Sequence, residues 1–203
     1  MNGLEVLPTS GMVSLQNYQK NQVSNAILAL FDNNPYTIYS IIDATCHIGG
    51  DAINFANTFP NADIICIDND FRAIQKCRKN VQLLNLENRF HIYYMDCIDY
   101  LNSAHEANVD ILYFDPPWGG YGYVKSHVFD LSLGGIDISI IINYCLTFHI
   151  AKNILIKVPR NFNIEKFLRM VNANISIIHI YKPHKNESTD NIGSIAYSML
   201  YIN

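Results

Sequence analysis

The segment from Asp115 to Gly120 combines a carboxylate, two prolines, a tryptophan and two glycines in the order D-P-P-W-G-G. Pro116 and Pro117 lack backbone N–H groups and have fixed φ angles, so they leave carbonyl oxygens in a rigid array beside the carboxylate. Such an array suits a substrate group that donates hydrogen bonds. Trp118, the only tryptophan, would offer a flat apolar surface on which a base stacks. We therefore expect Asp115, Pro116 and Trp118 to be the catalytic residues of a site that binds a base.

A second segment, D-A-T-C-H-I-G-G-D at residues 43–51, follows an apolar run and precedes a helical pattern. Its glycines would let a ligand approach the backbone closely, and the start of the helix offers free N–H groups to a polar or anionic group. The segment does not match the G-x-G-x-x-G dinucleotide pattern. A tight strand-to-helix turn without a ligand is therefore the alternative interpretation.

Asp68 stands 25 residues after Asp43 and 18 after Gly50, at the end of the next apolar run. In doubly wound sheets an acidic residue at about this distance accepts hydrogen bonds from a ribose hydroxyl, because the second strand ends beside the first loop. The alternative is that Asp70 is only the N-cap of the following helix and that Asp68 is merely exposed.

Asp96 follows the third apolar run and precedes Cys97. Its carboxylate could accept a hydrogen bond from an adenine amino group, or it could be a simple helix N-cap. Its position matters because it continues the series of acidic residues that end the first two runs. We expect the whole series to lie at one edge of a sheet.

The elements that must position these residues follow from apolar runs and helical spacing. Runs rich in Ile, Val and Tyr predict strands at Ile38–Ala44, Asp63–Ile67, Phe90–Met95, Val109–Phe114, Asn153–Val158, Ile175–Tyr181 and Ile192–Ile202. Helical spacing predicts helices at Asn17–Phe31, Asp51–Thr58, Phe71–Leu84, Cys97–Ala107, Asp137–Ile150 and Ile164–Val171.

Strands that alternate with helices predict an α/β fold, with a mostly parallel sheet of seven strands and helices on both faces. The polar segment Pro183–Asn191 is too short for a crossover helix, so the last two strands should form an antiparallel hairpin. We expect a single domain over residues 1–203, with a short helical segment at 1–35 and the catalytic core at 36–203. We also expect Tyr39, Phe55, Tyr93, Tyr94 and Phe148 to lie in the core.

Composition limits the function. With 49% hydrophobic and 16% charged residues, the 203-residue chain can bury a sizeable core, and its formal net charge of −4 excludes bulk charge as a way to bind long nucleic acids. The five cysteines contain no C-x-x-C pair, which argues against a structural zinc site and a disulfide framework. We expect no metal, no membrane span and an intracellular location, nuclear or cytoplasmic.

These motifs resemble class I S-adenosylmethionine-dependent methyltransferases that act on exocyclic amino nitrogens. More narrowly, D-A-T-C-H-I-G-G-D-A-I-N-F-A, I-C-I-D-N-D, F-D-P-P-W-G-G and V-P-R-N resemble the trimethylguanosine synthase family, which methylates guanine N2 of 7-methylguanosine caps. The likeness runs in order from about Tyr36 to Ile202. It implies a Rossmann-like class I fold, S-adenosylmethionine as cofactor, and the cap of RNA as substrate, with little contact to the RNA body.

The resemblance and the predicted topology assign site residues in two groups. The cofactor would be bound by Asp43, Thr45, Cys46, Gly49, Gly50, Asp68, Asn69, Asp96, Cys97 and Asp115. The cap would be bound by Trp118, which stacks on the methylated guanine, and by Lys125, Arg160 and Asn161. His127 and Lys157 are further cations that the topology places near the cap phosphates.

Three departures from the family pattern stand out. His47 replaces a glycine, and Asp115 replaces a small residue that is often Ser in the animal enzymes. Only about 35 residues precede the first strand, where the family has a longer arm that helps to close over the cap, so a protein partner is expected to supply that arm.

Positioning should be the main catalytic requirement, because the guanine N2 lone pair is delocalised and the cofactor methyl is already electrophilic. Hydrogen bonds from N2 to the Pro116 carbonyl and the Asp115 carboxylate would orient the nitrogen. A Trp face attracts the cationic 7-methylguanine by roughly 0.5–2 kcal/mol beyond stacking. Two alternatives stay open. One is methylation of another amino group, ribosomal RNA guanine-N2 or adenine-N6, and the other is a catalytically silent cap-binding or stimulatory subunit.

Overall fold

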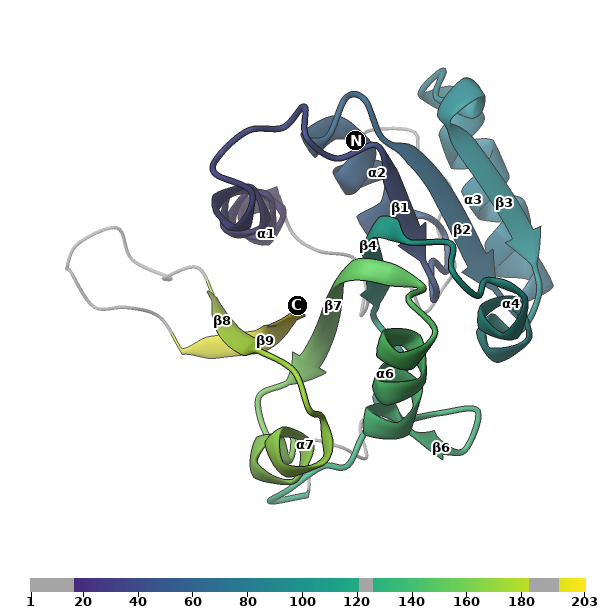
Figure 1. Ribbon diagram of the computed structural model, residues 1–203. Helices are drawn as coiled ribbons and strands as arrows, with labels where there is room; N and C mark the ends of the chain where they lie inside the picture. Colours follow the sequence, from purple (N-terminus) through teal and green to yellow (C-terminus); the bar gives the residue numbers. More distant parts are fainter. Residues whose placement is uncertain (1–16, 121–125, 183–193) are drawn as a thin grey trace, which may run out of the picture.

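The computed structural model describes residues 17–120, 126–182 and 194–203, which form a sheet between two layers of helices (Figure 1). The strands of the main sheet are β1 (Ser40–Asp43), β2 (Asp63–Asp68), β3 (Phe90–Tyr94), β4 (Val109–Phe114), β7 (Ala151–Pro159), β8 (Ile175–Tyr181) and β9 (Ile195–Ile202). The helices are α1 (Asn17–Leu30), α2 (Gly50–Thr58), α3 (Phe71–Leu83), the 3-10 turn η2 (Glu87–Arg89), α4 (Cys97–Ser103), α6 (Ile138–Thr147) and α7 (Ile164–Met170).

The seven strands lie in the order β3-β2-β1-β4-β7-β9-β8. The pairs from β3 to β7 are parallel, and β9 is antiparallel to both β7 and β8. The predicted α/β class and the terminal antiparallel hairpin are thereby confirmed. Strand order reverses between β1 and β4, and in open α/β sheets ligands bind in the crevice outside the carboxyl ends of the strands at such a point.

Both faces of the sheet are buried, as the apolar strands predicted. On β4, Ile111 and Tyr113 pack with α1, α2 and α3, whereas Leu112 and Phe114 pack with α4, α6 and α7. Every residue of β4 is buried. This central strand therefore rigidly positions the segment that follows it, which begins at Asp115.

The prediction of core aromatics is wrong at four of five positions. Phe55 is buried, but Tyr39, Tyr93, Tyr94 and Phe148 are exposed. Tyr93 and Tyr94 lie on β3, which is an edge strand with one open side. Tyr39 precedes β1, and Phe148 follows the end of α6. Aromatic type alone predicted burial, but position at an edge or an end exposes the ring.

A small hairpin was not predicted. It joins β5 (Ser132–Leu133) to β6 (Ile136–Asp137) through Gly134 and Gly135, whose φ angles are 60° and 80°. Two glycines with positive φ are typical of a two-residue hairpin turn. The predicted fourth helix is also too long, because α4 ends at Ser103 rather than at Ala107.

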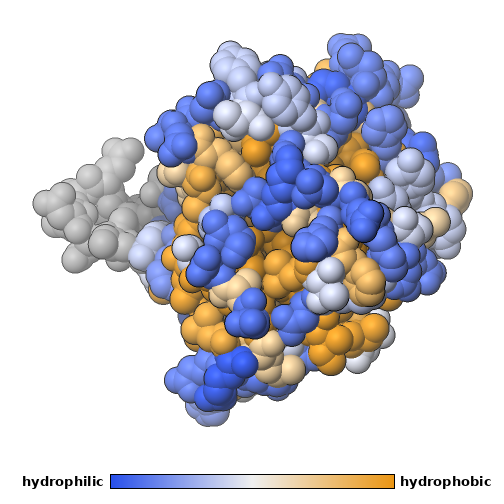
Figure 2. Space-filling model, in the orientation of Figure 1, coloured by the Kyte–Doolittle hydropathy of each residue, from blue (hydrophilic) through white to orange (hydrophobic). Residues whose placement is uncertain are grey.

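Among the described residues, no helix combines the length and the apolar character that a membrane span requires. Ile140 on α6 and Leu168 and Met170 on α7 are nevertheless exposed. Figure 2, in the orientation of Figure 1, shows orange surface interspersed with polar residues on this side of the molecule. The mixture fits a chain with only 16% charged residues.

Candidate active site

The predicted site residues converge at one edge of the sheet. Asp43 and Asp68 end β1 and β2, and Asp96, Asp115 and Arg160 follow β3, β4 and β7. These five strands are parallel, so their carboxyl ends meet along the same side. The arrangement places the loops after β1 and β4 on either side of the strand-order reversal.

The loop after β1 has a tightly defined backbone. The Gly49 N–H donates to the Cys46 carbonyl over 2.8 Å, and the Thr45 N–H donates to Asp43 Oδ1 over 3.3 Å. Gly49 has φ 84° and His47 has φ 49°, so His47 adopts the left-handed conformation that its place in the motif demands. A Cβ on Gly49 would lie 2.7 Å from the Cys77 sulfur, so the loop packs directly on α3.

Asp68 connects this loop to the start of α3. Its Oδ2 accepts the His47 N–H over 2.8 Å and its Oδ1 accepts the Asp70 N–H over 2.8 Å. Asp70 itself is the N-cap of α3 and accepts the N–H groups of Arg72 and Ala73, as the alternative interpretation predicted. The other half of that interpretation is wrong, because Asp68 is half-buried and hydrogen-bonded rather than merely exposed. Each carboxylate oxygen of Asp68 has a second lone pair, so the residue can still accept ribose hydroxyls.

Asp96 has one partner in the first turn of α4 and one directly after β2. Its Oδ1 accepts the Ile98 N–H over 2.8 Å, which makes it the N-cap of α4, and its Oδ2 lies 3.4 Å from the Asn69 amide nitrogen. The N-cap interpretation is therefore confirmed. Asp96 could still accept a hydrogen bond from an adenine amino group. Asn69 is exposed beside it, and Cys97 begins α4, where the first backbone N–H groups have no partner within the helix.

Asp115 is held from both sides of β4, by Thr45 of the β1 loop and by Lys157 of β7. Its N–H donates to Thr45 Oγ1 over 2.7 Å, and its Oδ2 lies 2.5 Å from Lys157 Nζ. The same ammonium lies 3.4 Å from Asp51 Oδ2 in the first turn of α2. Lys157 was expected among the cations that reach the cap phosphates. That expectation is wrong, because its side chain is only 6% exposed and is engaged by the two carboxylates.

The electrostatics of this region are dominated by buried acids. Burial raises the pKa of Asp115 to about 6 even though Lys157 opposes the shift. Burial lowers the pKa of Lys157, but Asp115 and Asp51 raise it more, so the net shift is upward and the lysine stays charged. Burial, and then Asp51, raise the pKa of Asp43.

Asp43 is 1% exposed, and its Oδ2 finds no hydrogen-bond partner among the described residues. Asp51 and Asp115 share one buried cation, Lys157. A buried acceptor without a donor costs roughly 1–3 kcal/mol. The edge of the sheet therefore fits a ligand that brings hydrogen-bond donors or positive charge.

Trp118 is less free than the sequence predicted. It is partly buried rather than fully exposed, and it packs against both core layers. Its ring lies 6.4 Å from that of Tyr197, between centroids, with an interplanar angle of 51°. Pro116 is buried, whereas Gly119 and Gly120 are exposed. The tryptophan is thus held close to Tyr197 of β9.

The loop after β7 carries Arg160 and Asn161. Arg160 is exposed, and the Asn161 amide donates to the Ser126 carbonyl over 2.8 Å. The Asn161 carbonyl accepts the Phe129 N–H over 2.8 Å, and Asn163 donates its N–H to the Phe129 carbonyl over 2.9 Å. The loop is therefore joined by backbone and side-chain bonds to the segment that precedes β5.

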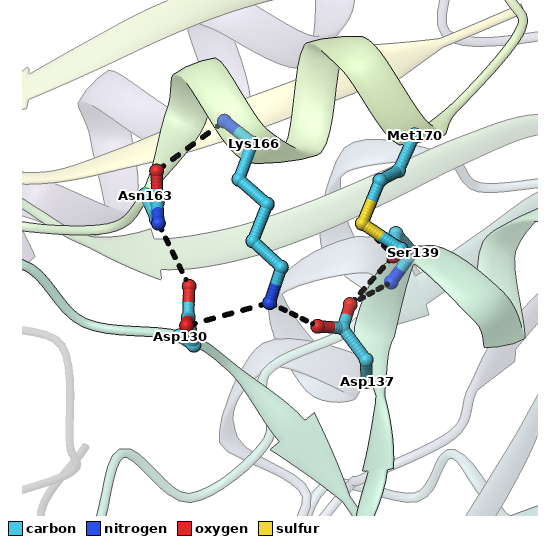
Figure 3. A network of polar contacts seen from close by, with 6 residues as sticks. All are labelled: Asp130, Asp137, Ser139, Asn163, Lys166 and Met170. Atoms are coloured by element: carbon cyan, nitrogen blue, oxygen red, sulfur yellow. Dashed lines mark hydrogen bonds and ion pairs between the residues drawn. The ribbon is translucent and has the colours of Figure 1, made fainter.

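Lys166 holds this junction from α7 (Figure 3). Its ammonium lies 2.7 Å from Asp137 Oδ2 and 3.3 Å from Asp130 Oδ2. The Asn163 amide also donates to Asp130 over 3.0 Å. The ammonium of Lys166 is therefore engaged by two aspartates. The cation on the loop after β7 is Arg160, which is exposed. Lys125 lies outside the described residues, and His127 is exposed nearby in sequence.

Three buried thiols lie under the β1 loop. The sulfur atoms of Cys46, Cys66 and Cys77 lie within 4.8 Å of one another, a set that could hold a metal ion. Sequence reasoning missed the set because it considered only C-x-x-C spacing. The Cys46 thiol faces the core, so its predicted cofactor role would fall to its backbone.

The expectation that the protein uses no metal stays a prediction. The neighbouring thiol of Cys66 raises the pKa of Cys46, and burial raises that of Cys66. The two neighbouring thiols lower the pKa of Cys77 to about 4. Three thiolates around a divalent ion would bury excess negative charge beside Asp43, so we assign the cluster to core packing.

Asp51 is a residue of this buried cluster that the sequence did not single out. Its Oδ2 accepts the Tyr113 hydroxyl over 2.8 Å and faces Lys157. A signal was available in the strand I-L-I-K-V-P, since a lysine inside a buried apolar run must meet an acidic partner. What the sequence did not reveal was which of the acids at the sheet edge that partner would be.

Comparisons with known proteins agree with this geometry. A family described as RNA cap guanine-N2 methyltransferase matches residues 38–196. Trimethylguanosine synthase of Saccharomyces cerevisiae is 26% identical over 133 residues, 64% of this chain and 41% of that protein. An uncharacterised protein of Acanthamoeba polyphaga mimivirus is 26% identical over 130 residues, 63% of this chain and 48% of that one.

Ribosomal RNA large subunit methyltransferase G of Shewanella amazonensis is 29% identical over 90 residues, 44% of this chain and 23% of that protein. The chain thus matches less than half the length of each of these relatives. Among solved structures, the N-terminal domain of human METTL16 in complex with SAH superposes with a TM-score of 0.62 at 12% identity, covering 97% of this chain and 72% of that one.

The structural likeness supports the class I methyltransferase fold, and the family match extends over most of the chain, from Ile38, just before β1, to Ala196 in β9. It includes every predicted site residue at the carboxyl edge. The chain therefore belongs to the RNA cap guanine-N2 methyltransferase family, a class I family whose methyl donor is S-adenosylmethionine.

Proposed function

We propose that this protein methylates the exocyclic N2 of 7-methylguanosine in RNA caps. The observation that carries the proposal is the position of Trp118. It follows β4 at the strand-order reversal, between the acidic edge formed by Asp43, Asp68 and Asp115 and the loop of Arg160. The Trp118 ring would stack on a base, the acidic edge would bind the cofactor, and the Arg160 guanidinium would bind the phosphates attached to that base.

The acidic edge fits the cofactor. When bound, S-adenosylmethionine supplies an electrophilic methyl group on a positively charged sulfur, and it also carries an ammonium and two ribose hydroxyls. Asp43 has a buried oxygen without a partner among the described residues, which suits the methionine part. Asp68 would accept from the ribose, and Asp96 with the Cys97 backbone would contact the adenine. Thr45, Gly49 and Gly50 shape the loop between them.

The acceptor nitrogen would be oriented mainly by the Pro116 carbonyl. Asp115 contributes less than its charge suggests, because one carboxylate oxygen already contacts Lys157 over 2.5 Å. An orienting role does not require a strong base, since the proton on N2 can leave to water after transfer. Holding the nitrogen in line with the methyl group can supply several kcal/mol of rate enhancement.

The cap phosphates would be bound by Arg160 together with Asn161. The guanidinium is exposed, and its planar fork matches phosphate oxygens. The loop that carries it is fixed by the bonds to Phe129 and Ser126. Lys125 remains a proposed contact that lies outside the described residues.

Labelled methyl transfer to a 7-methylguanosine-capped dinucleotide, compared with the unmethylated cap dinucleotide, tests the proposal. We expect transfer to the first and roughly 2- to 30-fold less to the second, because a cation–π attraction of about 0.5–2 kcal/mol is lost. The mass of the product tells whether one methyl group or two are added. Equal transfer to both dinucleotides, or none to either, would contradict cap methylation.

A second candidate is methylation of an amino group in ribosomal RNA. The specific observation in its favour is the likeness to the ribosomal RNA methyltransferase of Shewanella amazonensis over 90 residues. D-P-P-W would serve this reaction equally well, since it presents the same acceptor array. Transfer to uncapped RNA oligonucleotides that exceeds transfer to the capped dinucleotide would favour it. Calorimetry with the cofactor separates both enzymes from a silent cap-binding subunit, which would not bind it.

A further inference from the structure

Lys157 is a lysine in the interior of the sheet. It lies on β7 between Ile156 and Val158, which are both buried, and it is 5% exposed. Its ammonium contacts Asp115 and Asp51, and it lies 5.1 Å from the centroid of the Tyr197 ring. Lysine is almost never buried in this way unless an acid compensates its charge, so the residue needs an explanation beyond packing.

The contacts of Lys157 join the two halves of the proposed site. Asp115 begins the D-P-P-W segment after β4, and Asp51 lies in the first turn of α2, directly after the β1 loop. The Tyr113 hydroxyl donates to the same oxygen of Asp51 over 2.8 Å. Thr45 of the β1 loop accepts the Asp115 N–H over 2.7 Å. The buried ammonium of Lys157 therefore fixes the position of the D-P-P-W segment relative to the β1 loop.

The charge balance shows why an aspartate at position 115 depends on this lysine. Asp43, Asp51 and Asp115 are all shielded from solvent, and Lys157 is the cation that contacts two of them. Removal of one member of a buried pair is far more damaging than replacement of both, because it leaves an uncompensated charge. Without Lys157, Asp115 would have to turn toward solvent or take up a proton, and the segment behind it would move.

We propose that Lys157 is a positioning residue for methyl transfer, and that it holds Asp115 and the Pro116–Trp118 segment in register with the cofactor loop. The role of the β1 loop in binding S-adenosylmethionine follows from the family to which the chain belongs. The role of the Pro116–Trp118 segment in binding the base rests on the proposed function. The inference explains how this chain accommodates an aspartate at position 115, because Lys157 supplies the positive charge that a small neutral residue there would not need.

The chain contains a matched control five residues away. Lys152 of β7 lies 2.7 Å from Asp110 of β4, so the two strands carry two lysine–aspartate pairs with the same spacing, 152 with 110 and 157 with 115. The Lys152 side chain is 53% exposed, and its pair lies at the opposite end of β4 from Asp115. Its removal should affect neither the cofactor nor the cap.

The experiment compares Lys157→Met, Asp115→Ser, the double variant and the control Lys152→Met. Affinity for S-adenosylmethionine is measured by calorimetry, and kcat and KM are measured with a 7-methylguanosine-capped dinucleotide. We expect Lys157→Met to weaken cofactor binding about 10-fold and to lower kcat by about 100-fold, as a displaced reacting group does. KM for the cap should rise by no more than about 10-fold, because Trp118 shifts with the segment whereas Arg160 is untouched.

The decisive result concerns the double variant. Asp115→Ser with Lys157→Met removes both charges and leaves Asp51 with its Tyr113 donor, so cofactor affinity should return to within about 3-fold of Asp115→Ser alone. Lys152→Met should behave like the wild type. Wild-type affinity in Lys157→Met, or no recovery in the double variant, would overturn the inference.

If Lys157→Met does not fold, the double variant and Lys157→Arg still decide the matter, since both keep the local charge balanced. A double variant that is soluble but fails to bind the cofactor refutes the pairing. Cofactor affinity does not depend on which base is methylated. The expected affinity pattern without transfer to the cap would therefore refute the proposed function and leave the role of Lys157 standing.

Discussion

Trp118 offers a direct test of substrate choice, because it is the only tryptophan of the chain and its fluorescence reports on its own surroundings. We expect a 7-methylguanosine cap analogue to quench this fluorescence by stacking. Trp118→Ala should weaken binding of the analogue by about 10-fold, the loss of one stacked and charged base contact. Calorimetry with S-adenosylmethionine should give an unchanged affinity.

Trp118→Phe is the matched control for this change. It keeps a ring at the same place and should retain part of the affinity, with less preference for the 7-methylated base because a phenyl face attracts cations more weakly. Cap affinity that is the same in wild type and Trp118→Ala would show that the base lies elsewhere.

Asp115 should give methyl transfer an acidic limit. Its pKa is raised to about 6 by burial, so the carboxylate gains a proton as the pH falls through that value. Protonation removes the charge that faces Lys157 on β7, close to Asp51 on α2, Tyr113 on β4 and Tyr197 on β9. We expect kcat to decrease about 10-fold per pH unit below about 6.

The control for this pH profile is Asp115→Asn, which cannot gain that proton. Its kcat should be lower at neutral pH, but its decline should no longer centre near 6. An unchanged acidic limit in this variant would assign the titration to another group.

At the scale of residues, the sequence predicted which acidic residues lie at the carboxyl edge of the sheet, but it did not predict all of their partners. Asp68, Asp96 and Asp115 were placed at one edge because each ends or follows an apolar run, and parallel strands end together. The pairing of Asp115 with Lys157 was not predicted, because the two residues are 42 positions apart and only the register of β4 with β7 brings them together. The side to which Asp115 turns depends on that register.

At the scale of elements, the turn from the β1 loop into α2 can be tested at two adjacent glycines. Gly49 has φ 84°, and a Cβ there would lie 2.7 Å from the Cys77 sulfur, whereas a Cβ on Gly50 meets nothing within 4 Å. We expect Gly49→Ala to destabilise the protein by about 1–3 kcal/mol through left-handed strain and overpacking. It should also weaken cofactor binding.

Gly50→Ala is the control, because Gly50 begins α2 with a backbone that accepts alanine. Its unfolding free energy in urea should equal that of the wild type or exceed it slightly. If both variants lost the same stability, close packing of Gly49 on α3 would not be the cause.

The elements themselves were largely predictable. Buried parallel strands such as β4 are continuous apolar runs, and the Asp70 and Asp96 caps mark where helices begin. The β5–β6 hairpin escaped prediction because each of its strands has only two residues, too few to show a period. The exposed Tyr93 and Tyr94 were misjudged because the sequence does not show that β3 is the edge of the sheet.

At the scale of the whole molecule, charge predicts how much RNA is bound. The chain has a formal net charge of −4, and the exposed cation on the loop after β7 is Arg160. We expect a capped RNA of about 20 nucleotides to bind within about 3-fold of the capped dinucleotide, because few phosphates are neutralised. The dependence of log affinity on log salt should have a slope between about −1 and −3.

Arg160→Ala should reduce that slope by about 1, whereas Arg169→Ala, an exposed arginine in the last turn of α7, should leave it unchanged. A steep slope in the wild type, or a capped RNA that binds far better than the dinucleotide, would reveal an RNA-body surface that the net charge argues against.

The position of β9 also determines when the sheet can be completed during synthesis. Residues 195–202 lie between β7 and β8, pair with both, and bury Ile202 completely. As the chain leaves the ribosome, β1 to β7 can pair in order, but the open sides of β7 and β8 must wait for residues 195–202, which follow both strands in the chain. The apolar strand β7 stays unpaired on that side meanwhile, which makes this interval the one in which a chaperone has the most to protect.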